Sequence, residues 1–153
     1  MKKEITVDIL CCLFALLFLY TGLIKLTDNE TFRWALLKSP LLHGIAPVLS
    51  IVIPICEVLI ALGLFFSRTR QVALYAFLSL MGIFTIYIGF MLYFRSDRPC
   101  TCGGIIVYMN WHQHFYFNSL FTLLAVLTSW LNKKVQMQGP LSAKNFPYKH
   151  AKV

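Results

Sequence analysis

The sequence predicts an all-α membrane protein, a bundle of four transmembrane helices, and three observations support this. First, 58% of its 153 residues are hydrophobic and only 13% are charged, against about 45–50% and about 25% in soluble domains. Second, the apolar residues gather in four runs, each near or above the ~20 residues that cross a hydrocarbon core of about 30 Å. Third, no run alternates with period two as a barrel strand would, so helices must satisfy the backbone in lipid.

The predicted helices cover residues 5–26, 45–66, 72–94 and 115–131. The first is interrupted only by Asp8 and, at its far end, by Lys25, and the second contains a single charge, Glu57. The third and fourth contain no charged residue. The first run resembles a signal peptide, but it is too long and lacks a small-residue cleavage site, so we expect it to be retained as a helix.

The basic residues predict the orientation of the bundle. They lie at segment ends rather than in a stripe interleaved with aromatics, which argues against nucleic-acid binding despite the net charge of +8. With both termini in the cytoplasm, nine Lys and Arg lie inside and five outside, and the Arg68-Thr69-Arg70 turn is the clearest local signal. We therefore expect a multi-pass protein of the bacterial inner membrane, with a membrane domain over residues 1–132 and a basic cytoplasmic tail over 133–153.

This topology places the segment 95–114 in the oxidising outer compartment, where its Cys100-Thr101-Cys102 motif is the most informative polar feature. A disulfide between residues i and i+2 requires a bent backbone. Such a bridge closes a very short loop, so it is expected to be redox-active rather than structural. Gly103-Gly104 supplies the freedom for the turn. Two incidental loop thiols are the plainer interpretation.

A metal site is an alternative for the same segment. Cys100, Cys102, His112 and His114 could form a tetrahedral Cys₂His₂ set for zinc or copper. The gap between the cysteines is shorter than in common zinc motifs, and side chains at i and i+2 diverge on a helix. The histidines could instead join Trp111 in an aromatic belt at the membrane surface, or one could act as the base that maintains a thiolate.

Glu57 is the second candidate functional residue because a carboxyl group at membrane depth is costly and usually marks a site or pathway. It is interpreted as a proton carrier or as a hydrogen-bond partner for a quinone. The structural alternative is a bond to another helix, for example to Tyr87 or Asn118. Lys25, at the outer end of the first helix, is expected to extend its ammonium group to the interface.

The order of these motifs resembles the DoxX/MauE superfamily of four-helix membrane proteins, over roughly residues 8–131. The first helix ends in G-x-x-K, the second contains P-x-x-E, and "CTCGGIIVYMNWHQHFYFN" looks like the cysteine-containing outer loop and the start of helix four in the MauE-like, redox-associated branch. The positions that match the family motifs are Gly22, Lys25, Pro54, Glu57, Cys100, Cys102 and Asn118.

The resemblance implies a role in thiol–disulfide chemistry. MauE is associated with maturation of methylamine dehydrogenase, whose small subunit is rich in disulfides, and DoxX relatives are linked to quinone-coupled sulfur oxidation. We therefore expect a thiol–disulfide oxidoreductase or electron-transfer protein with a quinone as the candidate cofactor. Its expected partners are the lipid bilayer, a periplasmic thiol-containing protein and a membrane-protein complex, but no nucleic acid.

The residues assigned to this chemistry form two overlapping sets. The catalytic candidates are Cys100, Cys102, Glu57, His112 and His114. The candidates for contact with the cofactor are Glu57, Lys25, Asn118 and Trp111, and no metal ligand is assigned. Two alternatives remain open, namely a non-catalytic assembly subunit for a periplasmic partner and the Cys₂His₂ metal-binding loop.

Overall fold

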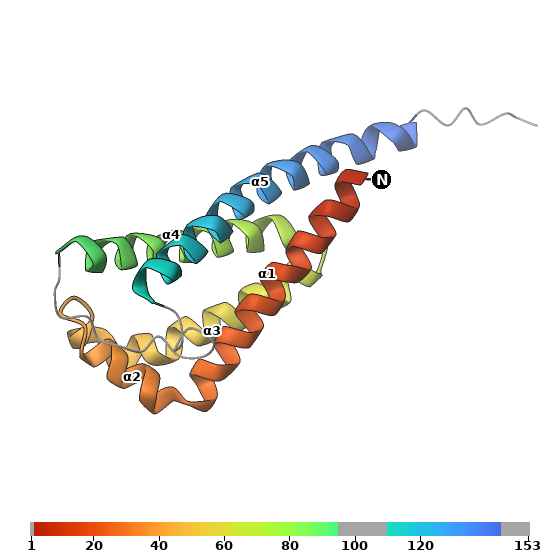
Figure 1. Cartoon of the computed structure of the whole chain (residues 1–153). Helices are drawn as coiled ribbons and strands as arrows, with labels where there is room; N and C mark the ends of the chain where they lie inside the picture. The colour runs from red at the N-terminus through yellow and green to blue at the C-terminus, as the bar shows by residue number, and fades with distance from the viewer. Residues whose placement is uncertain (1, 95–109, 145–153) are drawn as a thin grey trace, which may run out of the picture.

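The computed structural model describes residues 2–94 and 110–144, and these residues form helices joined by short turns (Figure 1). The helices are α1 (Lys2–Thr27), α2 (Asn29–Leu37), the short 3₁₀ helix η1 (His43–Ile45), α3 (Ala46–Phe65), α4 (Arg70–Phe94) and α5 (Trp111–Lys144). No strand occurs in these two described ranges. The predicted all-α class is therefore confirmed.

Three of the helical segments are long and apolar enough to cross a membrane: Lys3–Thr27, His43–Phe65 and Arg70–Phe94. They correspond to the first three predicted crossings. α5 is not among these candidates, and its buried polar residues explain why, because they lower its mean hydropathy. These are His114, Asn118, Thr128, Ser129 and Asn132. The fourth crossing therefore stays a prediction.

α5 also differs from its predicted counterpart in length, because it continues past Leu131 to Lys144. The residues that follow Leu131 include Lys, Gln and Met, which have high intrinsic helix propensity. A helix of such residues does not need lipid around it to continue. The first part of the predicted basic tail, which begins at Lys133, is therefore helical as far as Lys144.

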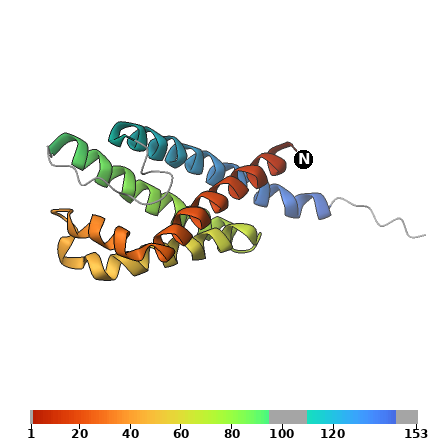
Figure 2. The ribbon, with the colours of Figure 1, turned by 60° about the horizontal axis from the view of Figure 1, so that its bottom comes forward.

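The helices pack as two crossed pairs. α4 and α5 run side by side, and α1 crosses diagonally between this pair and α3 (Figures 1 and 2). Aromatic rings fill the crossing point: the Phe77 ring of α4 lies 4.6 Å from Phe14 and 4.2 Å from Phe18 of α1, between centroids. Phe121 of α5 meets Phe14 edge-on at 6.0 Å. This core fixes α1 against both α4 and α5.

Large apolar side chains cover much of the outer surface of the bundle. Examples are Ile86, which is 75% exposed, Leu59 at 61% and Leu123 at 68%. Such a surface would be unfavourable in water but matches the hydrocarbon of a bilayer. Together with the three apolar helices, it indicates a membrane protein.

α2 lies on α3 at the end of the bundle where α1 finishes (Figure 1). The Asp28 carboxylate caps α2 by accepting a hydrogen bond from the Thr31 N–H. Phe32 and Leu36 face inward in a small apolar cluster with Ala46, whereas Trp34 is exposed. α2 therefore has one buried face and one face toward its surroundings.

A proline in α3 explains how α2 is attached. Pro54 has no N–H, so the carbonyl of Ser50, four residues earlier, lacks its helical donor. The Asn29 side-chain amide at the start of α2 donates to that carbonyl at 2.6 Å. The gap left by Pro54 is thus filled by a residue of the neighbouring helix.

Candidate functional site

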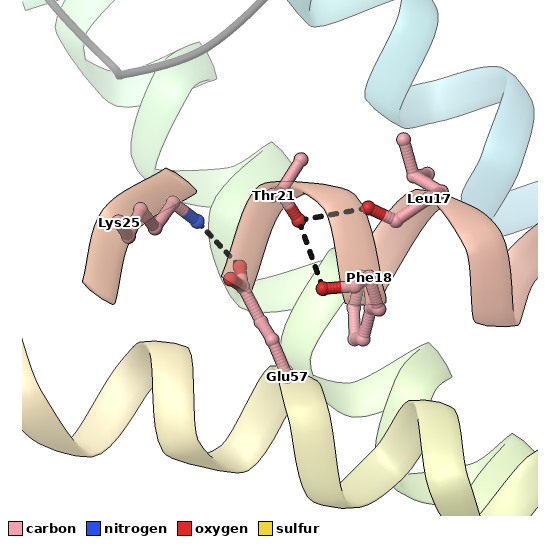
Figure 3. A network of polar contacts seen from close by, with 5 residues as sticks. All are labelled: Leu17, Phe18, Thr21, Lys25 and Glu57. Atoms are coloured by element: carbon pink, nitrogen blue, oxygen red, sulfur yellow. Dashed lines mark hydrogen bonds and ion pairs between the residues drawn. The ribbon is translucent and has the colours of Figure 1, made fainter. Parts of the chain in front are cut away.

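A buried ion pair joins α1 to α3. Lys25 Nζ donates to Glu57 Oε1 at 2.5 Å, and the two residues are only 7% and 1% exposed (Figure 3). The prediction that Lys25 extends to the membrane surface is therefore wrong. A carboxylate on the adjacent helix is a better partner for a cation at this depth than a distant interface, because both charges are neutralised without reaching water.

Gly22 lets the two helices approach closely enough for this pair to form. A Cβ atom at position 22 would lie 3.0 Å from Val58 Cγ2, 3.1 Å from the Pro54 carbonyl oxygen and 3.2 Å from Glu57 Cβ. Only glycine avoids these contacts, as is usual where helices pack closely in membranes. The G-x-x-K and P-x-x-E motifs are therefore two sides of one helix contact.

Aromatic rings surround the ammonium group of this pair. Lys25 Nζ lies 5.3 Å from the ring centroid of Phe32 in α2 and 5.3 Å from that of Phe84 in α4. Both distances fall within the range of cation–π attraction. Four elements, α1 to α4, thus contribute side chains to one buried charged site.

The second oxygen of the carboxylate, Glu57 Oε2, is buried and has no hydrogen-bond partner in the described part of the chain. Thr21 lies nearby, but its hydroxyl donates to the carbonyls of Leu17 and Phe18 in its own helix, at 3.0 and 3.4 Å (Figure 3). A buried acceptor without a donor is unfavourable by about 1–3 kcal/mol, and more when it is charged. The site is therefore equipped to accept one further hydrogen bond.

A further hydroxyl contact closes the same end of the bundle. The Tyr87 hydroxyl of α4 donates to Ser39 Oγ at 2.8 Å, just beyond the end of α2. Ser39 is 1% exposed. This contact and the Asn29–Ser50 bond hold α2 over the ion pair from two sides.

The two histidines of α5 face different surroundings, as expected for positions i and i+2. His112 is exposed, whereas His114 is 9% exposed. Burial lowers the pKa of His114 to about 4, and the nearby positive charge of Lys25 lowers it further in the same direction. His114 is therefore neutral at pH 7 and lies within electrostatic reach of the ion pair. Asn118 is buried one turn further along α5.

The structure thus brings together three of the predicted site residues: Lys25 and Glu57 form the ion pair, and His114 lies within reach of the Lys25 charge. Asn118 is buried on α5, whereas His112 is at the surface. Cys100 and Cys102 lie outside the described residues. Trp111 begins α5, but its side chain is also outside them. Across residues 2–94 and 110–144, no group of three His, Cys, Asp or Glu side chains could hold a metal ion.

In a comparison with protein families, the family described as "Methylamine utilisation protein MauE" matches residues 3–131. The chain belongs to the MauE family. The match spans α1 to α4 and the apolar part of α5, and so includes every predicted motif position. The suspected MauE-like membrane protein is confirmed, while the wider relation to DoxX stays a prediction. Comparisons with curated proteins and with solved structures gave no match.

The opposite end of this MauE-family bundle holds a second polar cluster, which sequence reasoning missed. Arg70 Nη1 donates to Asp8 Oδ1 at 2.7 Å and links α4 to α1. Asn132 Nδ2 donates to Gln71 Oε1 at 2.7 Å and links α5 to α4. These pairs tie three helices together. We interpret them as structural.

The signal that could have revealed the Lys25–Glu57 pair was present in the sequence. The first apolar segment carries Lys25 near its outer end, and the second carries Glu57, an ionisable residue of opposite sign. Ionisable groups in membrane helices usually pair with one another. Together with Gly22, this pattern was sufficient to predict a contact between the two helices.

Proposed function

We propose that this MauE-family membrane protein exchanges thiols and disulfides with a periplasmic protein through Cys100 and Cys102. One observation carries the proposal. In the sequence, both cysteines precede Asn110, where the described chain resumes one turn before His114, and His114 is within electrostatic reach of the buried Lys25–Glu57 pair. A segment with two thiols therefore ends beside a site that holds ionisable groups out of water.

The proposed exchange begins with attack by a thiolate of the partner on the Cys100–Cys102 disulfide, which forms a mixed disulfide and releases one thiolate of the pair. The partner's second thiolate then breaks the mixed disulfide. The partner gains a disulfide, and Cys100 and Cys102 become a dithiol, so two electrons and two protons have moved to this chain. A low thiol pKa favours the attacking form. The neutral ring of His114 can donate and accept hydrogen bonds at the start of α5, while its pKa of about 4 makes it a weak base.

A quinone would supply the oxidant that restores the disulfide, by accepting two electrons and two protons. Lys25, Glu57, Asn118 and Trp111 are the residues that would hold it. The chemistry of the ion pair and its surroundings suits a quinone. Glu57 Oε2 is a buried acceptor without a donor, and the rings of Phe32 and Phe84 offer flat apolar surfaces beside Lys25.

The family name suggests a biological setting. We extend it to this chain as part of the proposal: the partner would be a disulfide-containing periplasmic protein of methylamine utilisation, and the host membrane would be a bacterial inner membrane. Nine cytoplasmic against five external basic residues support the orientation that this requires.

Trapping the mixed disulfide tests the exchange. In cells, Cys100→Ser or Cys102→Ser variants should each retain a single thiol of the pair, and one of the two should accumulate a covalent adduct with the partner. The adduct should disappear on reduction and should be identified by mass spectrometry. Cys12→Ser is the matched control, since Cys12 is exposed on α1 and has no assigned role.

The same variants separate exchange from an assembly role. If the Cys100→Ser/Cys102→Ser protein supports the host pathway as well as the wild type and neither single variant forms an adduct, the exchange proposal is wrong. The bundle would then act as an assembly subunit without redox chemistry.

A further inference from the structure

We propose that Glu57 makes the buried site selective for the reduced, hydroxyl-bearing form of a quinone over the oxidised form. This inference rests on the proposed function, because it concerns the quinone that would occupy the site. It adds a direction of electron flow, from protein thiols to the quinone, which neither the family match nor the sequence motifs provide.

The carboxylate of Glu57 has one oxygen atom that accepts no hydrogen bond from the described residues. Glu57 is 1% exposed, its Oε1 accepts a hydrogen bond from Lys25, and its Oε2 has no donor within the described residues. The neighbouring hydroxyl of Thr21 already donates to carbonyls of α1. Thr21 nevertheless stabilises the charged carboxylate from close by. A ligand that brings an O–H or N–H donor to Oε2 would give this oxygen the hydrogen bond that it lacks.

The oxidised and reduced forms of a quinone differ in the hydrogen bonds that they can make. An oxidised quinone has carbonyl oxygens, which only accept hydrogen bonds, whereas each hydroxyl of a hydroquinone both donates and accepts. The Lys25 ammonium has donors beyond the one used by Glu57, and these can serve a carbonyl or a hydroxyl alike. Glu57 Oε2 therefore distinguishes the two forms, and Lys25 does not.

The other side chains around the ion pair do not favour the quinone over the hydroquinone. His114 is neutral at pH 7, so its ring has one donor and one acceptor nitrogen and suits either form. The rings of Phe32 and Phe84 make apolar contacts that do not depend on the oxidation state. The ion pair already balances its own charge, so an uncharged ligand is preferred over an anion or a cation.

Preferential binding of the reduced form has a redox consequence. It raises the reduction potential of the bound couple, and a tenfold preference corresponds to about 30 mV for a two-electron couple. A higher potential favours the reaction in which a dithiol loses two electrons and two protons to form a disulfide and the quinone gains them to form a hydroquinone. The site would thus favour oxidation of protein thiols.

Binding measurements test this without requiring turnover. The full chain carrying Cys100→Ser/Cys102→Ser, in detergent and without oxygen, cannot pass electrons through the pair. Its dissociation constants for decylbenzoquinone and decylhydroquinone are measured by equilibrium dialysis and by tryptophan fluorescence. We expect the hydroquinone to bind at least tenfold more tightly, since a hydrogen bond to a charged acceptor contributes about 1.5–3 kcal/mol.

Two variants show that Glu57 is the cause. Glu57→Gln should reduce the preference to less than threefold. Lys25→Glu/Glu57→Lys keeps a buried pair of opposite charges but moves the carboxylate to α1, so it should also lose the preference, even if Glu57→Gln folds poorly. Arg70→Gln, which breaks the ion pair at the opposite end, should keep it.

The binding results distinguish the selectivity of the site from quinone binding itself. Equal binding of the two forms by the Cys100→Ser/Cys102→Ser protein, or tighter binding of the quinone, overturns the selectivity and leaves quinone binding itself intact. Binding of neither form overturns the selectivity and the quinone part of the proposed function. The mixed-disulfide experiment above is independent of both results and tests the thiol exchange alone.

Discussion

At the scale of single residues, the charge of Lys25 is stabilised by protein groups instead of solvent. Glu57 neutralises it, and the rings of Phe32 and Phe84 flank it. Breaking a buried pair by removing one partner leaves an uncompensated charge and typically costs about 3–5 kcal/mol, although replacing both partners by apolar residues is often neutral or stabilising by about 1–4 kcal/mol. The difference between the single and the double substitution therefore shows how strongly the two charges depend on each other.

We therefore expect Glu57→Leu to lower the free energy of unfolding by roughly 3–5 kcal/mol and Lys25→Met/Glu57→Leu to recover most of that loss. Arg70→Gln is the matched control, because the Asp8–Arg70 pair is partly exposed and such pairs contribute about 0–1 kcal/mol. The measurement is denaturant unfolding in detergent. Equal destabilisation by the single and double variants would show that the charges are not coupled.

A second prediction at the scale of residues concerns Gly22. Gly22→Ala should destabilise the protein by about 1–3 kcal/mol, because the added methyl group must push α1 away from the Pro54 carbonyl and Val58. Gly82→Ala in α4 is the control: its added Cβ meets nothing within 4 Å, and alanine is favoured over glycine in a helix by about 0.5–1 kcal/mol. Thermal unfolding should thus shift in opposite directions, and a parallel shift would contradict the close-contact account.

At the scale of elements, α2 is connected to α3 through an exchange of hydrogen-bond partners. Pro54 removes the donor to the Ser50 carbonyl, and Asn29 replaces it. The proline therefore does more than bend or weaken α3. It creates an acceptor that fixes the position of α2 over the buried ion pair.

A double-mutant cycle tests this exchange. Asn29→Ala should cost about 1–3 kcal/mol, because it leaves the buried Ser50 carbonyl without a donor. In a Pro54→Ala background, a backbone N–H returns at position 54 and can bond to the Ser50 carbonyl within α3. The cost of Asn29→Ala should then fall below about 0.5 kcal/mol, as for a surface change. Additive effects of the two substitutions would contradict the coupling.

The helices themselves were predictable because length and hydropathy suffice to define them. α1, α3 and α4 begin and end within a few residues of the predicted segments. α5 was predicted too short, since a hydropathy criterion cannot follow a helix beyond the membrane into residues such as Lys133 and Lys134. Pairing between helices was harder: Lys25 was assigned to the interface because an isolated segment does not show which neighbour is within reach.

At the scale of the whole molecule, the number of membrane crossings determines whether the two termini lie on the same side of the membrane. Three helices have the apolar length to span a bilayer, and α5 has a polar buried face and apolar outer residues such as Leu123, Val126 and Leu127. Lipid would contact only that outer surface. We therefore expect α5 to cross despite its lower mean hydropathy.

Reporter fusions test this topology. A fluorescent protein that folds only in the cytoplasm should be active when fused after Val153, and alkaline phosphatase at the same point should be inactive. A fusion within the outer segment between α4 and α5 is the internal control and should give the opposite pattern. Active phosphatase after Val153, with the amino terminus inside, would mean that α5 does not cross.

The central claim is that Cys100 and Cys102 form a redox-active pair, and their oxidation state in cells tests it most directly. The chain would carry Cys11→Ala, Cys12→Ala and Cys56→Ala, so that only these two thiols remain. Cells with intact oxidation machinery are quenched in acid, and thiols are then alkylated with a mass tag before and after reduction. We expect no tag before reduction and two tags after it. Two tags without any reductant would contradict it.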